Sequence, residues 1–354
     1  MDTMASEPKT AILFLNLGGP DCLENVEPFL YNLFSDPEII RLPLSAIFQK
    51  PLAKYIAMSR GDEARHNYSM MGGGSPILGY TQDQARALRA RLSELWGKEA
   101  PPVYIGMRYW HPFTEQTVDE ILRDNVERLI VLPLYPQFSY TTTGSSINAL
   151  QDALKAKQAK IDLRIVPPYY LHPSYQASLA DALRDGLENH CWSCPTDQVQ
   201  VLFSAHSLPL NHVKRTKDPY PDQIFACANA VMKQYFPDNP WDLCYQSRVG
   251  NMRWLGPATE GALGYFAGKN VDNILLVPIS FVSDHVETLV EIDRQYLPFA
   301  ESLQLPHCHR APSLNTRPVF ISALADLVNE ALTTEPESTV LSGGIVSFKI
   351  PQPA

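Results

Sequence analysis

Short apolar runs alternate along this sequence with longer segments in which apolar residues recur every three or four positions. Such runs are typical of buried parallel strands, and the segments between them are typical of the helices that connect one parallel strand to the next. The alternation therefore predicts an α/β fold with parallel sheets. The predicted strands cover residues 11–17, 103–107, 129–134, 164–167, 199–204, 242–246 and 273–279. The predicted helices cover residues 23–34, 79–96, 114–128, 145–159, 174–189, 221–234 and 256–267, and two more begin near 283 and 318.

The alternation of strands and helices extends from residue 11 to about 165 and then begins again, which predicts two doubly wound domains. A length of 354 residues agrees with two domains of roughly 150 residues each. We expect the domains at 1–165 and 166–317, a helix at 318–334 that packs back on the first domain, and a tail at 335–354. Ligands of such folds bind outside the carboxyl ends of the strands, so we expect the site in a central cleft between the domains.

Charge and composition exclude several classes of protein. The chain has 38 acidic and 29 basic residues, a net charge of −9, whereas proteins that bind nucleic acid need a basic surface. The longest apolar stretch, 274–281, is far shorter than the roughly 18 residues of a membrane-spanning helix. The N-terminus lacks a basic region followed by an apolar core, and six cysteines are too few for a disulfide scaffold. We therefore expect a cytoplasmic protein without a nucleic-acid partner.

His206 is the first candidate for chemistry, because it directly follows an apolar strand and precedes a Ser-Leu-Pro turn. In this place an imidazole can act as a base near neutral pH or bind a metal ion. The alternative is a histidine that is hydrogen-bonded at a strand end and serves the fold alone.

A predicted acidic helix that begins near Ser283 is the second candidate. Asp284, Glu287 and Glu291 are spaced i, i+3 and i+7 and so share one helix face, next to His285. An acidic row with a nearby histidine can hold a divalent cation or relay protons. The alternative is a solvated face whose acidic residues lie near the positive end of the helix dipole.

Arginine and aromatic side chains follow two other predicted strands. Arg108 and Tyr109 follow the second strand, and Trp254 lies after the sixth. Arginine can pair with a ligand carboxylate and aromatic rings can stack on a planar ligand, although strand ends also carry such residues for packing alone. The glycine-rich segments 72–76 and 143–146 match neither nucleotide-binding pattern, so a nucleotide-dependent enzyme is disfavoured.

Two further features are ambiguous. Cys191 and Cys194 form a C-x-x-C that follows a helix and lacks a second pair, which disfavours a redox motif or a zinc site. Residues 28–60 are rich in large apolar side chains. Most of these side chains are expected in the core, and the excess can form an apolar lip that contacts a hydrophobic ligand or a membrane surface.

Taken together and in order, the motifs at these positions closely resemble those of the ferrochelatase family, whose members insert ferrous iron into a porphyrin. The resemblance covers about residues 11–330. The motifs that carry it are LNLGGP at 15–20, GGGSP at 72–76, GMRY at 106–109, LPLYPQFS at 132–139, TTGS at 142–145, FSAHSLP at 203–209, QSRVG at 246–250, WLGP at 254–257 and SDHVET at 283–288.

The resemblance implies a chelatase-like bilobal fold of two Rossmann-like domains with the porphyrin in the cleft. It implies that His206 and Glu287 face each other across the macrocycle and handle the metal and the pyrrole protons. It places His285, Glu287 and Glu291 on a π-widened helix, with Asp284 in the same catalytic set. The porphyrin-contacting positions that it implies are Arg60, Tyr68, Ser75, Arg108, Tyr109 and Trp254.

The expected reaction is the insertion of Fe²⁺ into protoporphyrin IX, with His206 as proton acceptor or iron ligand and no cofactor beyond the Fe²⁺ substrate. Some family members bind an iron–sulfur cluster, but here no cysteine follows Cys308 and Tyr140 takes an internal cluster position, so no such cluster is expected. The alternatives are a coproporphyrin or other tetrapyrrole chelatase and a tetrapyrrole-binding protein without catalysis. Peripheral membrane contact through residues 28–60 is a further expectation, and the sequence leaves the oligomeric state open.

Overall fold

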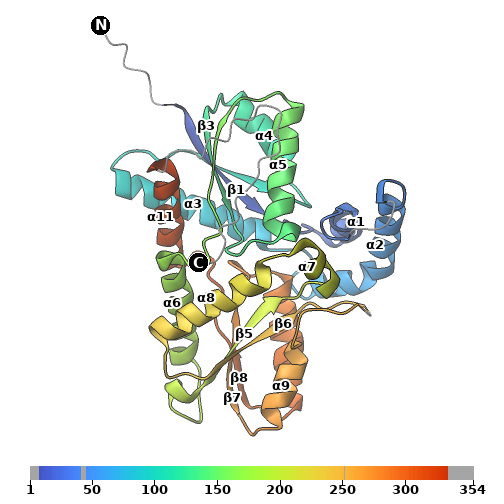
Figure 1. Ribbon diagram of the computed structural model, residues 1–354, viewed down its shortest axis with the longest axis vertical. Helices are drawn as coiled ribbons and strands as arrows, with labels where there is room; N and C mark the ends of the chain where they lie inside the picture. Colours follow the sequence, from blue (N-terminus) through green and yellow to red (C-terminus); the bar gives the residue numbers. More distant parts are fainter. Residues whose placement is uncertain (1–7, 41–44, 251, 334–354) are drawn as a thin grey trace.

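Two four-stranded parallel sheets form the centre of the molecule (Figure 1). The computed structural model describes residues 8–40, 45–250 and 252–333. The first sheet has the order β2-β1-β3-β4 and the second has the order β6-β5-β7-β8. The strands are β1 (Thr10–Asn16), β2 (Val103–Met107), β3 (Arg128–Pro133), β4 (Asp162–Ile165), β5 (Gln200–His206), β6 (Trp241–Gln246), β7 (Asn273–Pro278) and β8 (His307–Arg310). The expected α/β fold with two parallel sheets is confirmed.

Helices flank both sheets, and most of them begin or end within three residues of the predicted positions. The α-helices are α1 (Val26–Ser35), α2 (Ser45–Ser69), α3 (Ile77–Trp96), α4 (Thr114–Arg123), α5 (Ser145–Ala156), α6 (Pro173–Asn189), α7 (Leu210–Thr216), α8 (Tyr220–Tyr235), α9 (Thr259–Ala267), α10 (Leu297–Ser302) and α11 (Pro318–Thr333). Two π-helices, which have wider turns, are η2 (Tyr140–Gly144) and η4 (Glu287–Tyr296).

Four helices differ from the prediction. The long helix α2 and the short α7 were not predicted; α2 contains Pro51, a residue that ordinarily ends a helix. Helix α4 ends at Arg123 and not at 128, because Asn125 takes a left-handed conformation with a φ of 53° and turns the chain toward β3. The helix expected near 283 begins only at Glu287. It is a π-helix there, as the resemblance implies for Glu287 and Glu291, but His285 lies before its start.

Helices α1 and α2 pack against each other and project from the side of the molecule (Figure 1). Their inner faces form an apolar cluster with the segment after β2, made of Val26, Phe29, Leu30, Ala57, Tyr68, Tyr109 and Trp110. Val286 packs against this cluster. Val286, the residue before Glu287, therefore contacts the α1–α2 projection, although it follows β7 of the second sheet.

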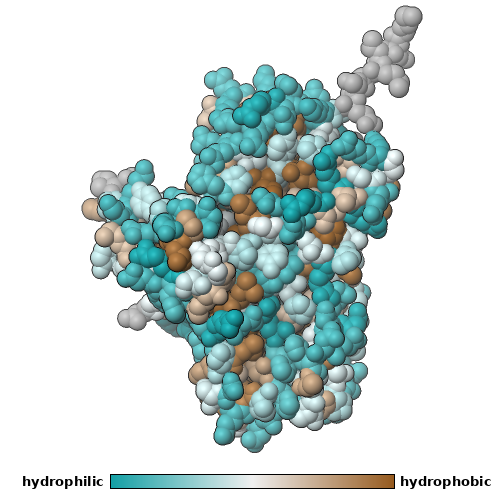
Figure 2. Space-filling model, turned by 180° about the vertical axis from the view of Figure 1, so that it is seen from behind, coloured by the Kyte–Doolittle hydropathy of each residue, from teal (hydrophilic) through white to brown (hydrophobic). Residues whose placement is uncertain are grey.

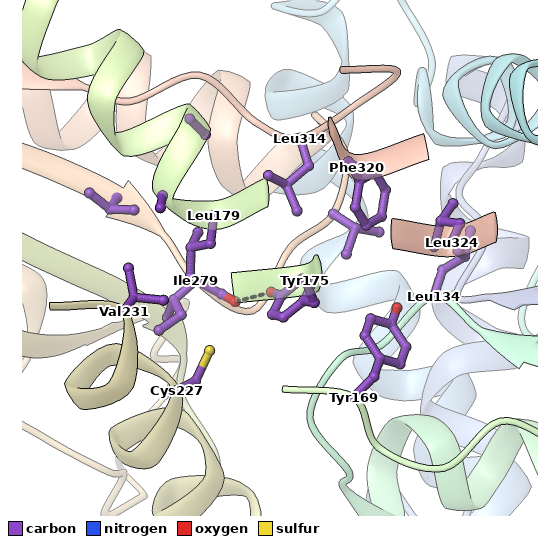
Figure 3. Close-up of a cluster of buried hydrophobic side chains, with 14 of the residues drawn as sticks. Leu134, Tyr169, Tyr175, Leu179, Cys227, Val231, Ile279, Leu314, Phe320 and Leu324 are labelled. Atoms are coloured by element: carbon purple, nitrogen blue, oxygen red, sulfur yellow. Dashed lines mark hydrogen bonds between the residues drawn. The ribbon is translucent and has the colours of Figure 1, made fainter. Parts of the chain in front are cut away.

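One large apolar core extends across both sheets. It contains Phe14 and Ile130 from the first sheet and Leu275 and Val277 from the second. Helix α11 supplies Phe320 and Leu324 to this core and packs against both α3 and α6 (Figure 3). Tyr175 and Ile279 meet in the same region, where the tyrosine hydroxyl donates a hydrogen bond of 3.4 Å to the Ile279 carbonyl (Figure 3). This shared core holds the carboxyl ends of the two sheets at the middle of the molecule.

The expected tail at 335–354 lies outside the described residues. In the part of the chain that the structure describes, every helix is too short or too polar to cross a membrane.

Candidate active site

His206 is the last residue of β5, and its ring is fixed in one orientation. Its Nδ1 lies 2.7 Å from the carbonyl oxygen of Ser207. Because a carbonyl only accepts hydrogen bonds, Nδ1 carries the proton and Nε2 keeps a free lone pair. The backbone is held as well, since the His206 N–H donates to Ser280 Oγ and the Tyr220 hydroxyl donates to the His206 carbonyl, both at 3.0 Å. The ring nitrogen that can take a proton or bind a metal is thus Nε2.

His285 and Glu287 form a second group close to His206. His285 Nε2 lies 3.2 Å from Glu287 Oε2, and both side chains are nearly buried. The ring of Phe281 lies between the histidines, with its centroid 4.6 Å from that of His285 and 6.4 Å from that of His206. His285 Nδ1 and Glu287 Oε2 are buried without a hydrogen-bond partner. Unsatisfied buried polar atoms are costly, so they mark a place where a ligand can supply the missing partner.

Glu291 lies one turn after Glu287 on η4 and is held by the end of β6. Its carboxylate accepts hydrogen bonds from Gln246 Nε2 at 2.9 Å and from Ser247 Oγ at 2.6 Å. Gln246 also donates to the Glu287 carbonyl at 2.8 Å. Burial, together with the negative charge of Glu287, raises the pKa of Glu291 to about 8. The raised pKa favours a protonated Glu291 near neutral pH, so a proton can be held beside the carboxyl group of Glu287.

Asp284 does not share the helix face with Glu287 and Glu291, and that expectation was wrong. It precedes η4, and its carboxylate accepts hydrogen bonds from Thr288 Oγ1 (2.8 Å), Ser313 Oγ (2.7 Å), Asn315 Nδ2 (2.8 Å) and Arg310 Nη1 (3.2 Å). Burial alone would raise the pKa of Asp284, but the charge of Arg310 and these hydrogen bonds hold it below its usual value. The carboxylate is thus a fixed anion that anchors the start of η4.

Tyr68, at the end of α2, faces the same region from the first half of the chain. It is buried in the cluster formed by α1 and α2, and burial together with the negative charge of Glu287 raises the pKa of its hydroxyl. Arg60 lies two turns earlier on α2, 3.9 Å from Glu63. Trp254 lies in the loop after β6, where its Nε1 donates a 3.0 Å hydrogen bond to the Val249 carbonyl. Tyr68 is thus a predicted contact residue that the structure brings up to the acidic group formed by Glu287 and Glu291.

Ser75 lies at a tight approach between two loops. Its N–H donates a 2.7 Å hydrogen bond to the Pro20 carbonyl. A Cβ at Gly19 would lie 2.6 Å from Ser75 Oγ, so only glycine fits there. Ser75 lines a surface pocket of about 430 Å³ together with Gly19, Asp21, Leu78, Trp110, His111, Pro112, Gln116 and Glu120. A ligand group can reach the hydroxyl from this pocket.

Arg108 and Tyr109 differ most from their expected roles. Arg108 Nη2 donates to Asp36 Oδ2 at 2.8 Å and Nε donates to Ser145 Oγ at 2.6 Å. The Tyr109 hydroxyl donates to the same Asp36 oxygen at 2.7 Å, and Tyr109 has no exposed surface. Arg108 is thus already paired with a buried acid, and Tyr109 cannot stack on a ligand in this conformation. Asp36 carried no signal in the sequence, because its partners lie more than 70 residues away.

Comparison with known proteins identifies the family of this chain. The family model for ferrochelatase matches residues 9–332. The chain belongs to the ferrochelatase family. Proteins named ferrochelatase from Cyanothece sp. and Synechocystis sp. are each 46% identical to it, over 92% and 93% of this chain and 83% and 84% of theirs. The solved structure of SirB from Bacillus subtilis with Fe³⁺ covers 92% of this chain and 96% of its own with a TM-score of 0.56, at 11% identity, and so supports the fold alone.

Candidate metal ligands and cysteines are relevant to the metal chemistry of this family. In the described ranges no group of three histidine, cysteine, aspartate or glutamate side chains is placed to hold a metal ion. All six cysteines are unpaired, and burial raises the pKa of Cys227, Cys244 and Cys308 to about 12.

Gln246 and Ser247 were not singled out from the sequence as site residues. They begin the QSRVG segment at 246–250 and lie at the carboxyl end of a predicted strand. That place in a parallel sheet was the available signal, since ligands and catalytic groups gather there. The structure adds that both side chains hold Glu291.

Proposed function

We propose that this protein inserts Fe²⁺ into protoporphyrin IX to form protohaem, with release of two protons. The observation that carries the proposal is the convergence of His206, His285 and Glu287 around Phe281, with Nε2 of His206 free and Glu287 Oε2 unsatisfied. Family membership supports the same reaction.

Two protons leave the pyrrole nitrogens as the metal enters, so the site needs two acceptors. His206 Nε2 accepts one, because its lone pair is free and its other nitrogen is already engaged with Ser207. Glu287 accepts the second and can pass it to Glu291, because the raised pKa of Glu291 favours its protonated form. Glu287 and His206 also contact Fe²⁺ on its way to the ring, as ligands weak enough to release it.

The remaining contacts divide into binding and positioning. Arg60, Tyr68, Ser75 and Trp254 contact the porphyrin in this proposal; each is only partly buried or lies against the acidic group. Arg108 and Tyr109 act through the Asp36 network and shape the wall behind the ligand. Asp284 anchors η4 and takes no proton, because its carboxylate is fully engaged.

The decisive experiment is anaerobic metallation of protoporphyrin IX with Fe²⁺, or with Zn²⁺ as a surrogate, followed by absorbance and loss of porphyrin fluorescence. Catalytic turnover that disappears in His206→Ala supports the proposal. Tight porphyrin binding without turnover would instead indicate a carrier, and faster turnover of coproporphyrin III would change the substrate. Iron ligation by His206 predicts that His206→Ala raises the KM for the metal, whereas the proton role that we favour predicts a fall in kcat.

A second part of the proposal is that Fe²⁺ serves as substrate alone, without an iron–sulfur cluster. Burial keeps the thiols of Cys227, Cys244 and Cys308 protonated, and Tyr140 lies at the position that some relatives fill with cysteine. The six unpaired cysteines also support a reducing, cytoplasmic compartment. An iron–sulfur absorption band in anaerobically purified protein would refute the absence of a cluster.

We also propose that α2 binds peripherally to a membrane surface. Phe48, Tyr55 and Met58 are spaced on one side of this helix and are 52%, 69% and 58% exposed. The α1–α2 projection stands away from the rest of the molecule and carries apolar side chains among charged ones (Figure 2, left). Exposed lysines at 50 and 54 suit an anionic lipid surface. Tyr55→Ser should reduce sedimentation with phosphatidylserine vesicles, whereas Phe225→Ser, at an aromatic residue on α8 that is 56% exposed, should not.

A further inference from the structure

Arg310, at the end of β8, joins two aspartates that lie on either side of Glu287. Its Nε and Nη2 donate to the two carboxylate oxygens of Asp293 at 2.6 and 2.9 Å. Its Nη1 donates to Asp284 Oδ1 at 3.2 Å. Asp284 comes three residues before Glu287 and Asp293 comes six residues after it. One guanidinium thus binds both ends of the segment that carries His285, Glu287 and Glu291.

We call the hydrogen bonds of Arg310 to Asp284 and Asp293 the clamp, and its chemistry requires arginine. The guanidinium is planar and presents its N–H groups as a fork, so it can engage one carboxylate through two bonds and still reach another. Side-chain exposure is 14% for Arg310 and 12% for Asp284, so water competes little for these bonds. Lysine would keep the charge but would offer a single point of contact.

The clamp acts on a segment that would not keep its shape unaided. A π-helix is an uncommon conformation, and η4 extends over ten residues from Glu287 to Tyr296. Its entry is closed by Thr288, whose Oγ1 donates to Asp284 Oδ1 at 2.8 Å and accepts the His285 N–H at 3.1 Å. Fixing Asp284 and Asp293 to one rigid group sets the span between them, and with it the places of His285 and Glu287.

The first half of the molecule holds the same clamp from the other side. Gln84 of α3 is completely buried, and its Nε2 donates to the carbonyls of Val282 and Asn315 at 3.1 and 3.0 Å. Asn315 in turn donates through Nδ2 to Asp284 Oδ2 at 2.8 Å. The position of the acidic group therefore depends on a polar connection that crosses between the two sheets.

We infer that Arg310 is a positioning residue for metal insertion, which acts through Asp284 and Asp293 to hold His285 and Glu287 where the metal passes into the ring. The inference rests on the proposed function. It predicts a loss of turnover without a loss of porphyrin binding, because Arg310 contacts the supports of the acidic group and not the apolar wall formed by α1 and α2.

The test compares Arg310→Lys with Arg317→Lys. Arg317 makes the same kind of double pair, with Asp181 at 2.7 Å and Asp185 at 2.6 Å, but both of its partners lie on α6 and neither lies on η4. Turnover of Zn²⁺ with protoporphyrin IX is measured per mole of porphyrin-binding sites, so that unfolded protein is not counted. We expect kcat to fall about 10- to 100-fold in Arg310→Lys, with the porphyrin Kd within about twofold of wild type, and to stay unchanged in Arg317→Lys.

Each other outcome has a defined meaning. Equal kcat in the two variants, or a parallel loss of porphyrin binding in Arg310→Lys, overturns the inference. If Arg310→Lys does not fold, Asp293→Asn removes the ion pair and keeps the Arg310–Asp284 contact, and an unchanged kcat in that folded variant overturns the inference as well. A wild-type protein that binds porphyrin but does not metallate it would refute the proposed function itself, before any variant is compared.

Discussion

His206 donates its Nδ1 proton to the carbonyl of Ser207 over 2.7 Å, which leaves Nε2 as its basic atom. We expect His206→Ala to lower kcat for metal insertion by about 100-fold or more, as the loss of a general base does, while porphyrin still binds. Metallation followed by fluorescence measures both quantities. His172→Ala is the control, because His172 pairs with Glu330 on α11 away from the site. Turnover close to that of wild type in His206→Ala would remove His206 from the mechanism.

The raised pKa of Glu291 predicts a pH-dependent stability. Between the usual glutamate pKa of 4.5 and the folded-state value of about 8, the folded protein binds more protons at this site than the unfolded chain does. The free energy of unfolding therefore falls as pH rises through this range, and the contribution is lost above pH 8. Glu291→Gln removes the titration, so its melting temperature should exceed that of wild type by a margin that grows from pH 5 to pH 8.5. A margin that is constant with pH would contradict the assignment.

Asp36 should be important for stability, because three groups depend on it. Arg108, Tyr109 and Ser145 all donate hydrogen bonds to its Oδ2. Asp36→Ala leaves a largely buried cation and two hydroxyls without their acceptor, and we expect it to cost about 3 kcal/mol of unfolding free energy. Urea denaturation measures this. Asp119→Ala breaks the exposed pair with Lys157 and should leave the midpoint unchanged. Equal midpoints for the two variants would refute the prediction.

Two glycines should respond to alanine in opposite directions. A Cβ at Gly74 would fall against the carbonyl of Asp21, whereas a Cβ at Gly264 in α9 meets nothing within 4 Å. Gly74→Ala should therefore destabilise the protein by about 1–3 kcal/mol, and Gly264→Ala should stabilise it by about 0.5–1 kcal/mol. Thermal unfolding of both variants checks the signs. A stabilised Gly74→Ala would mean that the loops at 19–21 and 72–76 are not in contact in solution.

Seven of the eight strands in the described residues could be predicted, because most of them are nearly continuous apolar runs, and β2 begins and ends at the predicted residues. The eighth, β8, was missed because its sequence HCHR is polar. The acidic helix was harder to place from its residues, because the spacing of the acidic residues in 284–291 is compatible with a regular α-helix as well as with a π-helix. Asp284 was misplaced for that reason. Helix α2 was not predicted, because it contains Pro51, which ordinarily ends a helix. The partner of Arg108 could not be found either, because a single sequence does not reveal that an aspartate 72 residues away lies beside it.

The two sheets have the same strand order, and the third strand of each leads to a π-helix, η2 after β3 and η4 after β7. The molecule is thus an approximate structural duplicate of itself. The π-helix of the first half carries Thr141 and Thr143, whose side chains are buried, and the π-helix of the second half carries the carboxylates of Glu287 and Glu291. The same backbone arrangement therefore carries neutral hydroxyls in one half of the molecule and ionisable carboxyl groups in the other, so the two halves differ in charge where their strand order agrees.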